Sequence, residues 1–99
     1  MEDLGFAEPG TAWREVLDGT FALDGDMPIN TDGGLKSFGH PVGASGLRML
    51  YEVWLQLRGE APDERRIPGT DRTLGLTHNL GGYPGEMVSF VGIYGTELG

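Results

Sequence analysis

The chain has 99 residues, of which 18 are glycine, and a formal net charge of −8 at pH 7. This length allows one small domain, which buries roughly 60% of the surface of its unfolded chain. Fifteen acidic residues against seven basic ones repel phosphate backbones and argue against nucleic-acid binding. The chain has no cysteine for disulfides or zinc ligation and no apolar run as long as a membrane span. We therefore expect a cytoplasmic protein without a metal site or a membrane span.

Residues 1–28 are expected to be irregular. Pro9-Gly10 marks a turn, and Thr11 can cap one short helix over Ala12–Leu17. Eight acidic residues against a single base, Arg14, occur in residues 1–32. So long an irregular stretch is unusual in a compact domain and suggests a segment that lies against a larger body.

Residues 29–99 are predicted to form the core, with a catalytic loop, a helix and two strands. Apolar side chains recur at helical spacing after residue 46, and Gly59 is a natural stop. The helix is therefore expected over about Ala44–Arg58. Its apolar residues are Leu47, Leu50, Tyr51, Trp54 and Leu57.

Two short runs rich in β-formers, Thr73–Thr77 and Met87–Tyr94, predict strands that can pair in antiparallel fashion. A charged loop over 59–71 precedes them, and residues 78–86 are expected to form a glycine-rich connection between them. The predicted fold class is α/β, with the helix packed on a mixed sheet.

The segment Gly33 to Gly46, GGLKSFGHPVGASG, is the part of the chain most committed to chemistry. Asn30 and Asp32 are expected to organise the turn before it. His40 lies between Gly39 and a proline, just before a helix N-terminus that favours anions. A lone loop histidine usually only bonds the backbone, but this stiff, glycine-rich setting favours a base or an oxyanion donor.

A second candidate loop, HNLGGYPGE, carries the other histidine, His78. Alone, His78 is better interpreted as a structural residue at a strand end; the alternative is that both histidine loops converge on one cavity. Asn79 either caps the turn or contributes an amide to an oxyanion site. Tyr83 either covers the turn or donates a proton in a pocket.

Phosphate-binding motifs are absent. A P-loop needs a lysine before the Ser/Thr that opens the helix, and here Ala44 precedes Ser45. A dinucleotide fingerprint needs three spaced glycines after a strand, and only Gly43 and Gly46 are in place. We therefore predict no bound cofactor.

Residues 30–48, NTDGGLKSFGHPVGASGLR, resemble the N-x-x-GG…GHP-x-GASG-x-R signature of the thiolase superfamily. THNLGGYPG corresponds to the family's last glycine-rich loop, and EDLGF near the start is similar to the sterol-carrier and lipid-transfer branch. The resemblance covers nearly the whole chain. It implies the C-terminal part of a thiolase-like α/β domain whose missing N-terminal part lies upstream.

The resemblance also implies a role for the candidate residues. His40 would activate a nucleophile and bind the oxygen of a coenzyme A thioester, which is a substrate and not a cofactor. Substrate-binding positions would be Gly39, His78 and Asn79, together with Gly81 and Gly82. The acylated cysteine of the family belongs to the missing part, so the isolated chain is predicted to be inactive. Family members pair their halves and form homodimers.

Because the last loop has no cysteine, three alternatives for the function are considered. Retro-aldol cleavage of a β-hydroxyacyl-CoA, as in lipid-transfer-protein-like aldolases of steroid side-chain degradation, is favoured; there Tyr83 would be the acid/base and an OB-fold protein a partner. The second alternative is an acyl-CoA thiolase or acetyltransferase of the sterol-carrier type. The third is a non-catalytic structural or interaction fragment.

Overall fold

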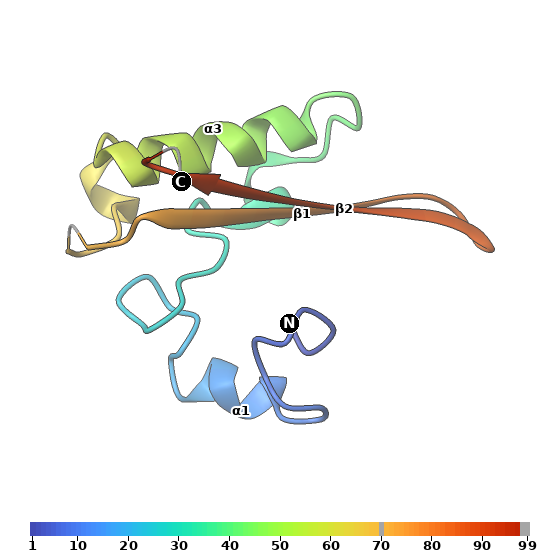
Figure 1. Ribbon diagram of the computed structural model, residues 1–99, viewed down its shortest axis with the longest axis horizontal. Helices are drawn as coiled ribbons and strands as arrows, with labels where there is room; N and C mark the ends of the chain where they lie inside the picture. The colour runs from blue at the N-terminus through green and yellow to red at the C-terminus, as the bar shows by residue number, and fades with distance from the viewer. Residues whose placement is uncertain (70, 98–99) are drawn as a thin grey trace.

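The computed structural model describes residues 1–69 and 71–97. Within these residues, three α-helices, a 3₁₀ turn and a β-hairpin follow one another (Figure 1). Their bounds are α1 Ala12–Leu17, α2 Gly34–Phe38, α3 Ser45–Arg58, η1 Asp63–Arg65, β1 Leu74–Tyr83 and β2 Glu86–Gly95. The predicted α/β class is confirmed, and the sheet of the described residues is a single antiparallel pair.

The hairpin is longer than the sequence pattern predicts. Strand β1 continues to Tyr83 and pairs with β2 from Leu74↔Gly95 to Tyr83↔Glu86, so the predicted connection over 78–86 is wrong. Only Pro84 and Gly85 link the strands, and Gly85 has a φ of 89°. Proline followed by a glycine with positive φ fits a type II turn.

Helix α3 covers one face of the hairpin. A Cβ built on Gly75 would lie 2.5 Å from Val53 Cγ1, and one built on Gly46 would lie 3.7 Å from Asn79 Nδ2. Because side chains alternate along a strand, Gly75, Thr77 and Asn79 share this face. Thr77 is accordingly buried under the helix.

Only part of the apolar stripe of α3 faces the hairpin. Leu47 is 71% exposed and Tyr51 54% exposed, whereas Ser45, Glu52 and Leu55 are the buried positions of the helix. The helix and its Gly59 C-cap are as predicted, with Gly59 at φ 68°. The outward part of the stripe leaves apolar surface uncovered by the described residues.

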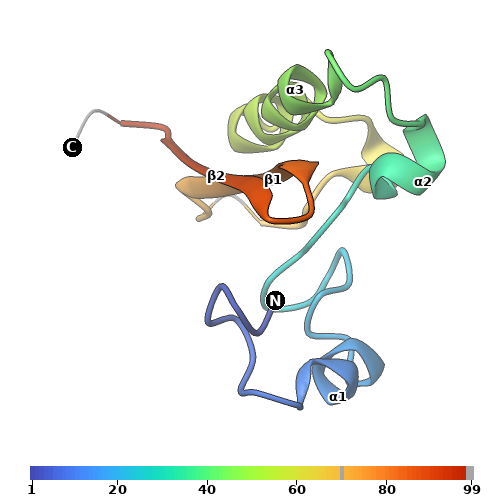
Figure 2. The same ribbon diagram turned by 90° about the vertical axis from the view of Figure 1, so that its right-hand side faces the viewer.

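The N-terminal segment with α1 lies on the other side of the hairpin (Figure 2). Helix α1 has its predicted bounds, but the Thr11 hydroxyl donates to Glu8 O and does not cap the helix. Arg72, just before β1, ties the segment to the hairpin by donating to Gly25 O and Asp26 O.

Few apolar side chains are buried. Among the described residues only Phe21, Leu55 and Ala61 form the buried apolar core. The face of the hairpin that α3 does not cover also presents large apolar residues to solvent: Leu74, Leu76, Leu80, Met87, Val91 and Ile93. In the part of the chain that is described, no helix has the length and apolar character to cross a membrane.

Candidate functional site

A short helix precedes the histidine loop. Helix α2 was not predicted, because its sequence GLKSF is bracketed by glycines that look like helix breakers. Gly33 enters the helix at φ 87°, and Gly39 leaves it at φ 80°. These left-handed values need glycine, so both residues set the path of the chain towards His40.

Asp32 and Arg48 hold this segment on α3. Asp32 Oδ1 accepts from Gly34 N at 2.9 Å, which confirms that Asp32 organises the turn. Its Oδ2 accepts from Arg48 Nη2, also at 2.9 Å, and the guanidinium lies 3.4 Å from the centre of the Phe38 ring. Arg48 thereby contacts α2 at both ends, through Asp32 before the helix and Phe38 at its last residue. The loop with His40 follows α2 and leads into α3.

A second polar cluster sits deeper on the same helix. Glu52 is 6% exposed; it accepts from Thr31 Oγ1 at 2.9 Å and pairs with Arg65 Nε at 3.1 Å. Gln56 Nε2 also donates to Glu52 and to Arg65 O. The cluster joins α3 to the 3₁₀ turn and to the chain before α2, and no sequence pattern indicated it.

His40 is exposed, but its ring is tied to a buried hydroxyl. His40 Nδ1 lies 2.6 Å from Ser45 Oγ, and Ser45 is only 3% exposed. Ser45 Oγ donates in turn to Pro41 O at 3.1 Å. The predicted candidate is therefore oriented at the start of α3, and Ser45 is the partner that sequence reasoning missed.

Two further polar candidates, Asn79 and His78, lie on opposite faces of β1. Asn79 lies on the α3 side, close to Gly46 in the first turn of that helix. His78 lies on the other face, where its Nε2 is 2.9 Å from Ser89 Oγ. The strand alternation thus brings Asn79 towards the loop of His40 and turns His78 away from it.

Tyr83 ends β1 and is 78% exposed. The β1–β2 turn projects past the loop that precedes α3 (Figure 1). Gly82 has a φ of 106°, and an added Cβ would lie 2.3 Å from Glu86 O, which explains a glycine there. A Cβ built on Gly39 or on Gly81 would meet no atom within 4 Å, so contacts among the described residues do not explain a glycine at Gly81.

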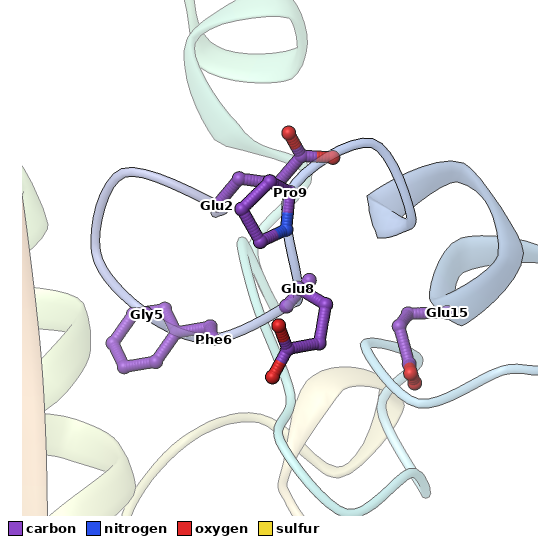
Figure 3. Close-up of a pocket in the computed structure, with 7 residues that line it drawn as sticks. Glu2, Gly5, Phe6, Glu8, Pro9 and Glu15 are labelled. Atoms are coloured by element: carbon purple, nitrogen blue, oxygen red, sulfur yellow. The ribbon is translucent and has the colours of Figure 1, made fainter.

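A hollow of about 400 Å³ lies elsewhere, in the N-terminal segment. Figure 3 shows three of its lining residues, Glu2, Glu8 and Glu15. Backbone N–H groups of Gly10 and Ala12 lower the pKa of the Glu2 carboxyl, so it stays ionised. An acidic hollow repels the phosphates of an acyl-CoA, and we do not assign the site to it.

No group of three or more His, Asp or Glu side chains in residues 1–69 and 71–97 is placed to hold a metal ion. The charged pair with shifted pKa values lies at the far end of α3. There the side-chain hydrogen bond between Arg58 and Glu60 raises the pKa of the arginine and lowers that of the glutamate. Both side chains are exposed, so this pair is a surface feature.

Comparison with known proteins identifies the class. The family model described as "Thiolase C-terminal domain-like" matches residues 1–94. The chain belongs to this thiolase C-terminal family, as the resemblance of residues 30–48 predicted. No solved structure matches the chain.

The chain is similar in sequence to several curated proteins. It is 49% identical to an acetyl-CoA acetyltransferase of Methanothermobacter thermautotrophicus over 86% of this chain and 21% of the relative. It is 38% identical to one of Methanocaldococcus jannaschii over 88% of this chain and 23% of the relative. With sterol carrier protein 2 of Homo sapiens it shares 44% identity over 81% of this chain and 14% of the relative. The chain thus spans at most about a fourth of the length of these relatives.

Proposed function

We propose that this chain is the C-terminal segment of a thiolase-type enzyme that cleaves or forms carbon–carbon bonds of acyl-CoA thioesters. The observation that carries the proposal is the exposed His40, held by buried Ser45 at the start of α3. Likeness to two acetyl-CoA acetyltransferases favours acyl transfer to coenzyme A over the other chemistries. The substrate would be an acyl-CoA, and no further cofactor is required.

His40 suits the thioester end of such a substrate. An exposed imidazole with one nitrogen hydrogen-bonded has its other nitrogen free to accept a proton from a nucleophile. Asn79 lies near the first turn of α3, so its amide can donate to a thioester oxygen beside His40. The nucleophile itself would come from protein outside these 99 residues, because the chain has no cysteine.

Retro-aldol cleavage of a β-hydroxyacyl-CoA is the second candidate, and one observation favours it. The β1 sequence that replaces the family's usual cysteine loop carries Tyr83, which is exposed and available as an acid/base. This branch would add an OB-fold partner and a role in steroid side-chain degradation. The relatives compared above are named for acyl transfer or sterol carriage, so we rank this reaction second.

The two reactions differ in their use of coenzyme A, and this difference supplies the test. Thiolysis of a β-ketoacyl-CoA consumes one free CoA and yields two acyl-CoA molecules. Retro-aldol cleavage of a β-hydroxyacyl-CoA yields one acyl-CoA and a carbonyl compound without free CoA. We expect CoA-dependent cleavage by the native protein that contains this chain; CoA-independent cleavage of the β-hydroxyacyl-CoA would reverse the ranking.

Variants connect the reaction to residues. His40→Ala should lower turnover by roughly 10²–10⁴-fold, the usual contribution of a general base. His78→Ala is the matched control, since this histidine lies on the opposite face of β1, and it should retain turnover. Equal losses for both variants would contradict the proposed site. Tyr83→Phe should lower only the retro-aldol reaction, by about 10²-fold or more.

We also propose that the exposed apolar surfaces of α3 and the hairpin pack against the rest of a thiolase fold. Apolar faces of this extent are typical of surfaces that another body of protein covers. The isolated 99 residues should then show no turnover with acyl-CoA, and robust turnover would contradict this. The homodimer and the cytoplasmic location expected from the sequence belong to the same proposal; the intact mass of the native protein tests the assembly.

A further inference from the structure

Lys36 is the single lysine of the chain, and it lies exposed on α2. Each of the six arginines contacts a carboxylate, a backbone carbonyl or an aromatic ring. Lys36 makes no ion pair and no side-chain hydrogen bond within residues 1–69 and 71–97. Its ammonium group is therefore the basic group of this part of the chain that is available to an anionic ligand.

Lys36 stands in the longest stretch of the chain without an acidic residue. Residues 33–51 contain two bases, Lys36 and Arg48, and no aspartate or glutamate, whereas residues 1–32 contain eight acids and one base. The guanidinium of Arg48 is offset by Asp32 at 2.9 Å, so Lys36 supplies the positive charge that is left on this stretch. An anionic ligand is consequently attracted to α2 and repelled by the N-terminal segment.

The same exposed surface carries Lys36 and His40. All residues from Leu35 to Ala44 are exposed, so most of α2 and the histidine loop form one uncovered stretch. Lys36 precedes His40 by four residues, and their Cα atoms are at most about 15 Å apart because consecutive Cα atoms are about 3.8 Å apart. The flexible four-carbon stem of lysine lets the ammonium group reach an anion at some distance from the imidazole.

The ligand of the proposed function has the form that this arrangement requires. A coenzyme A thioester carries its reacting carbonyl at one end of a long pantetheine arm and its phosphate groups at the other end. With the carbonyl at His40, the phosphates lie away from the imidazole and need a separate cation. A lysine ammonium group is a common partner of phosphate in proteins, where it acts as a point charge.

We propose that Lys36 is a substrate-binding residue that pairs with a phosphate group of coenzyme A while the thioester lies at His40. The inference rests on the proposed function for the identity of the ligand. Lys36 is not a catalytic residue, because it does not contact the reacting atoms. Its role is to favour thioesters of coenzyme A over thioesters of pantetheine alone, which have no phosphate.

Calorimetric titration of the native protein that contains this chain tests the inference, with free coenzyme A as the probe. Lys36→Gln should raise the Kd of coenzyme A about 3–10-fold, the loss expected for one charge-assisted hydrogen bond, and Lys36→Arg should restore it. Pantetheine should bind the wild-type protein and Lys36→Gln equally. Arg58→Gln is the matched control, since it removes the same charge at the far end of α3, about 20 Å from Ser45, and should leave the Kd unchanged.

A ligand series locates the contact. With dephospho-coenzyme A, a persisting effect of Lys36→Gln assigns the lysine to the pyrophosphate, and a lost effect assigns it to the 3′-phosphate. Equal weakening of coenzyme A and pantetheine, or no weakening of either, would overturn the inference.

The outcome for Lys36 is distinguishable from the outcome for the reaction. Turnover of acyl-CoA with no change of Kd in Lys36→Gln would contradict only the role of Lys36. Binding of coenzyme A that depends on Lys36, in a protein that turns over no acyl-CoA, would contradict only the proposed function. A native protein that binds no coenzyme A would contradict both.

Discussion

Asp32 and Arg48 are joined by a 2.9 Å ion pair that connects the turn before α2 to the start of α3. Their side chains are 11% and 27% exposed, so the pair is partly shielded from water. In the sequence, the loop that carries His40 lies between Asp32 and Arg48. The ion pair therefore holds together the two ends of the segment that contains this loop.

Asp32→Asn should destabilise the fold by about 1–2 kcal/mol, since a charge-assisted hydrogen bond is replaced by a weaker one of the same shape. Urea unfolding followed by circular dichroism measures the change. Glu60→Gln is the matched control: it removes an ion pair with Arg58 in which both side chains are about half exposed, and little change is expected. Equal effects of the two substitutions would show that Asp32 adds nothing beyond a surface charge.

Glu52→Ala should be more costly, at about 3 kcal/mol, because it leaves Arg65 without its buried partner and opens a gap beside Gln56. The same urea experiment measures it. Glu64→Ala serves as the control, as Glu64 is a neighbouring exposed acid in the 3₁₀ turn. A loss below about 1 kcal/mol for Glu52→Ala would indicate that the buried cluster is replaceable.

The sequence pattern was sufficient to predict α1 and α3, which are marked by local turn residues and apolar periodicity. In α1 the turn at Pro9-Gly10 and in α3 the apolar periodicity and Gly59 are local features, and both helices have nearly their predicted bounds. The histidine loop was likewise predicted from its glycines and proline. The apolar stripe of α3 gave the helix but not its orientation, since the buried side is set by Ser45, Glu52 and Leu55.

The length of β1 and the contact between His40 and Ser45 depend on interactions between residues that the sequence pattern does not reveal. The residues His78 to Gly82 have low strand propensity, but their partners in β2 are rich in β-formers, and pairing extends β1 through them. Only this extension sets Asn79 and His78 on opposite faces. The bond between His40 and Ser45 crosses a proline turn, and no residue pattern at a spacing of five predicts it. Whether His40, Asn79 and Tyr83 act on a substrate stays a prediction.

Gly75→Ala should destabilise the contact between β1 and α3 by about 1–3 kcal/mol. The new Cβ would lie 2.5 Å from Val53 Cγ1, and a β-branched valine in a helix has little freedom to move aside. Thermal and urea unfolding measure the cost. Gly81→Ala in the same strand is the control, because its Cβ would meet no atom within 4 Å.

A double-mutant cycle sharpens this test. Val53→Ala removes the atom that the new Cβ would strike, so Gly75→Ala should cost less in that background than in the wild-type sequence. An interaction free energy of about 1 kcal/mol in the compensating direction is expected. Strictly additive effects would mean that α3 does not pack on β1 through these two residues.

The Glu2 carboxylate should make the N-terminal segment sensitive to acid. N–H groups of Gly10 and Ala12 lower the pKa of Glu2, and Ala12 N lies 3.0 Å from Glu2 Oε1. A lowered pKa means that the ionised group stabilises the fold; this contribution is fully present above the ordinary glutamate pKa and is lost as the pH falls through the lowered one. The Ala12 amide signal in NMR should therefore titrate with a midpoint below the ordinary glutamate value, and Glu2→Gln should make it independent of pH in that range. A midpoint at the ordinary value would show that the carboxylate does not hold the start of α1, and the segment would then have to be anchored through Arg72 and the hairpin alone.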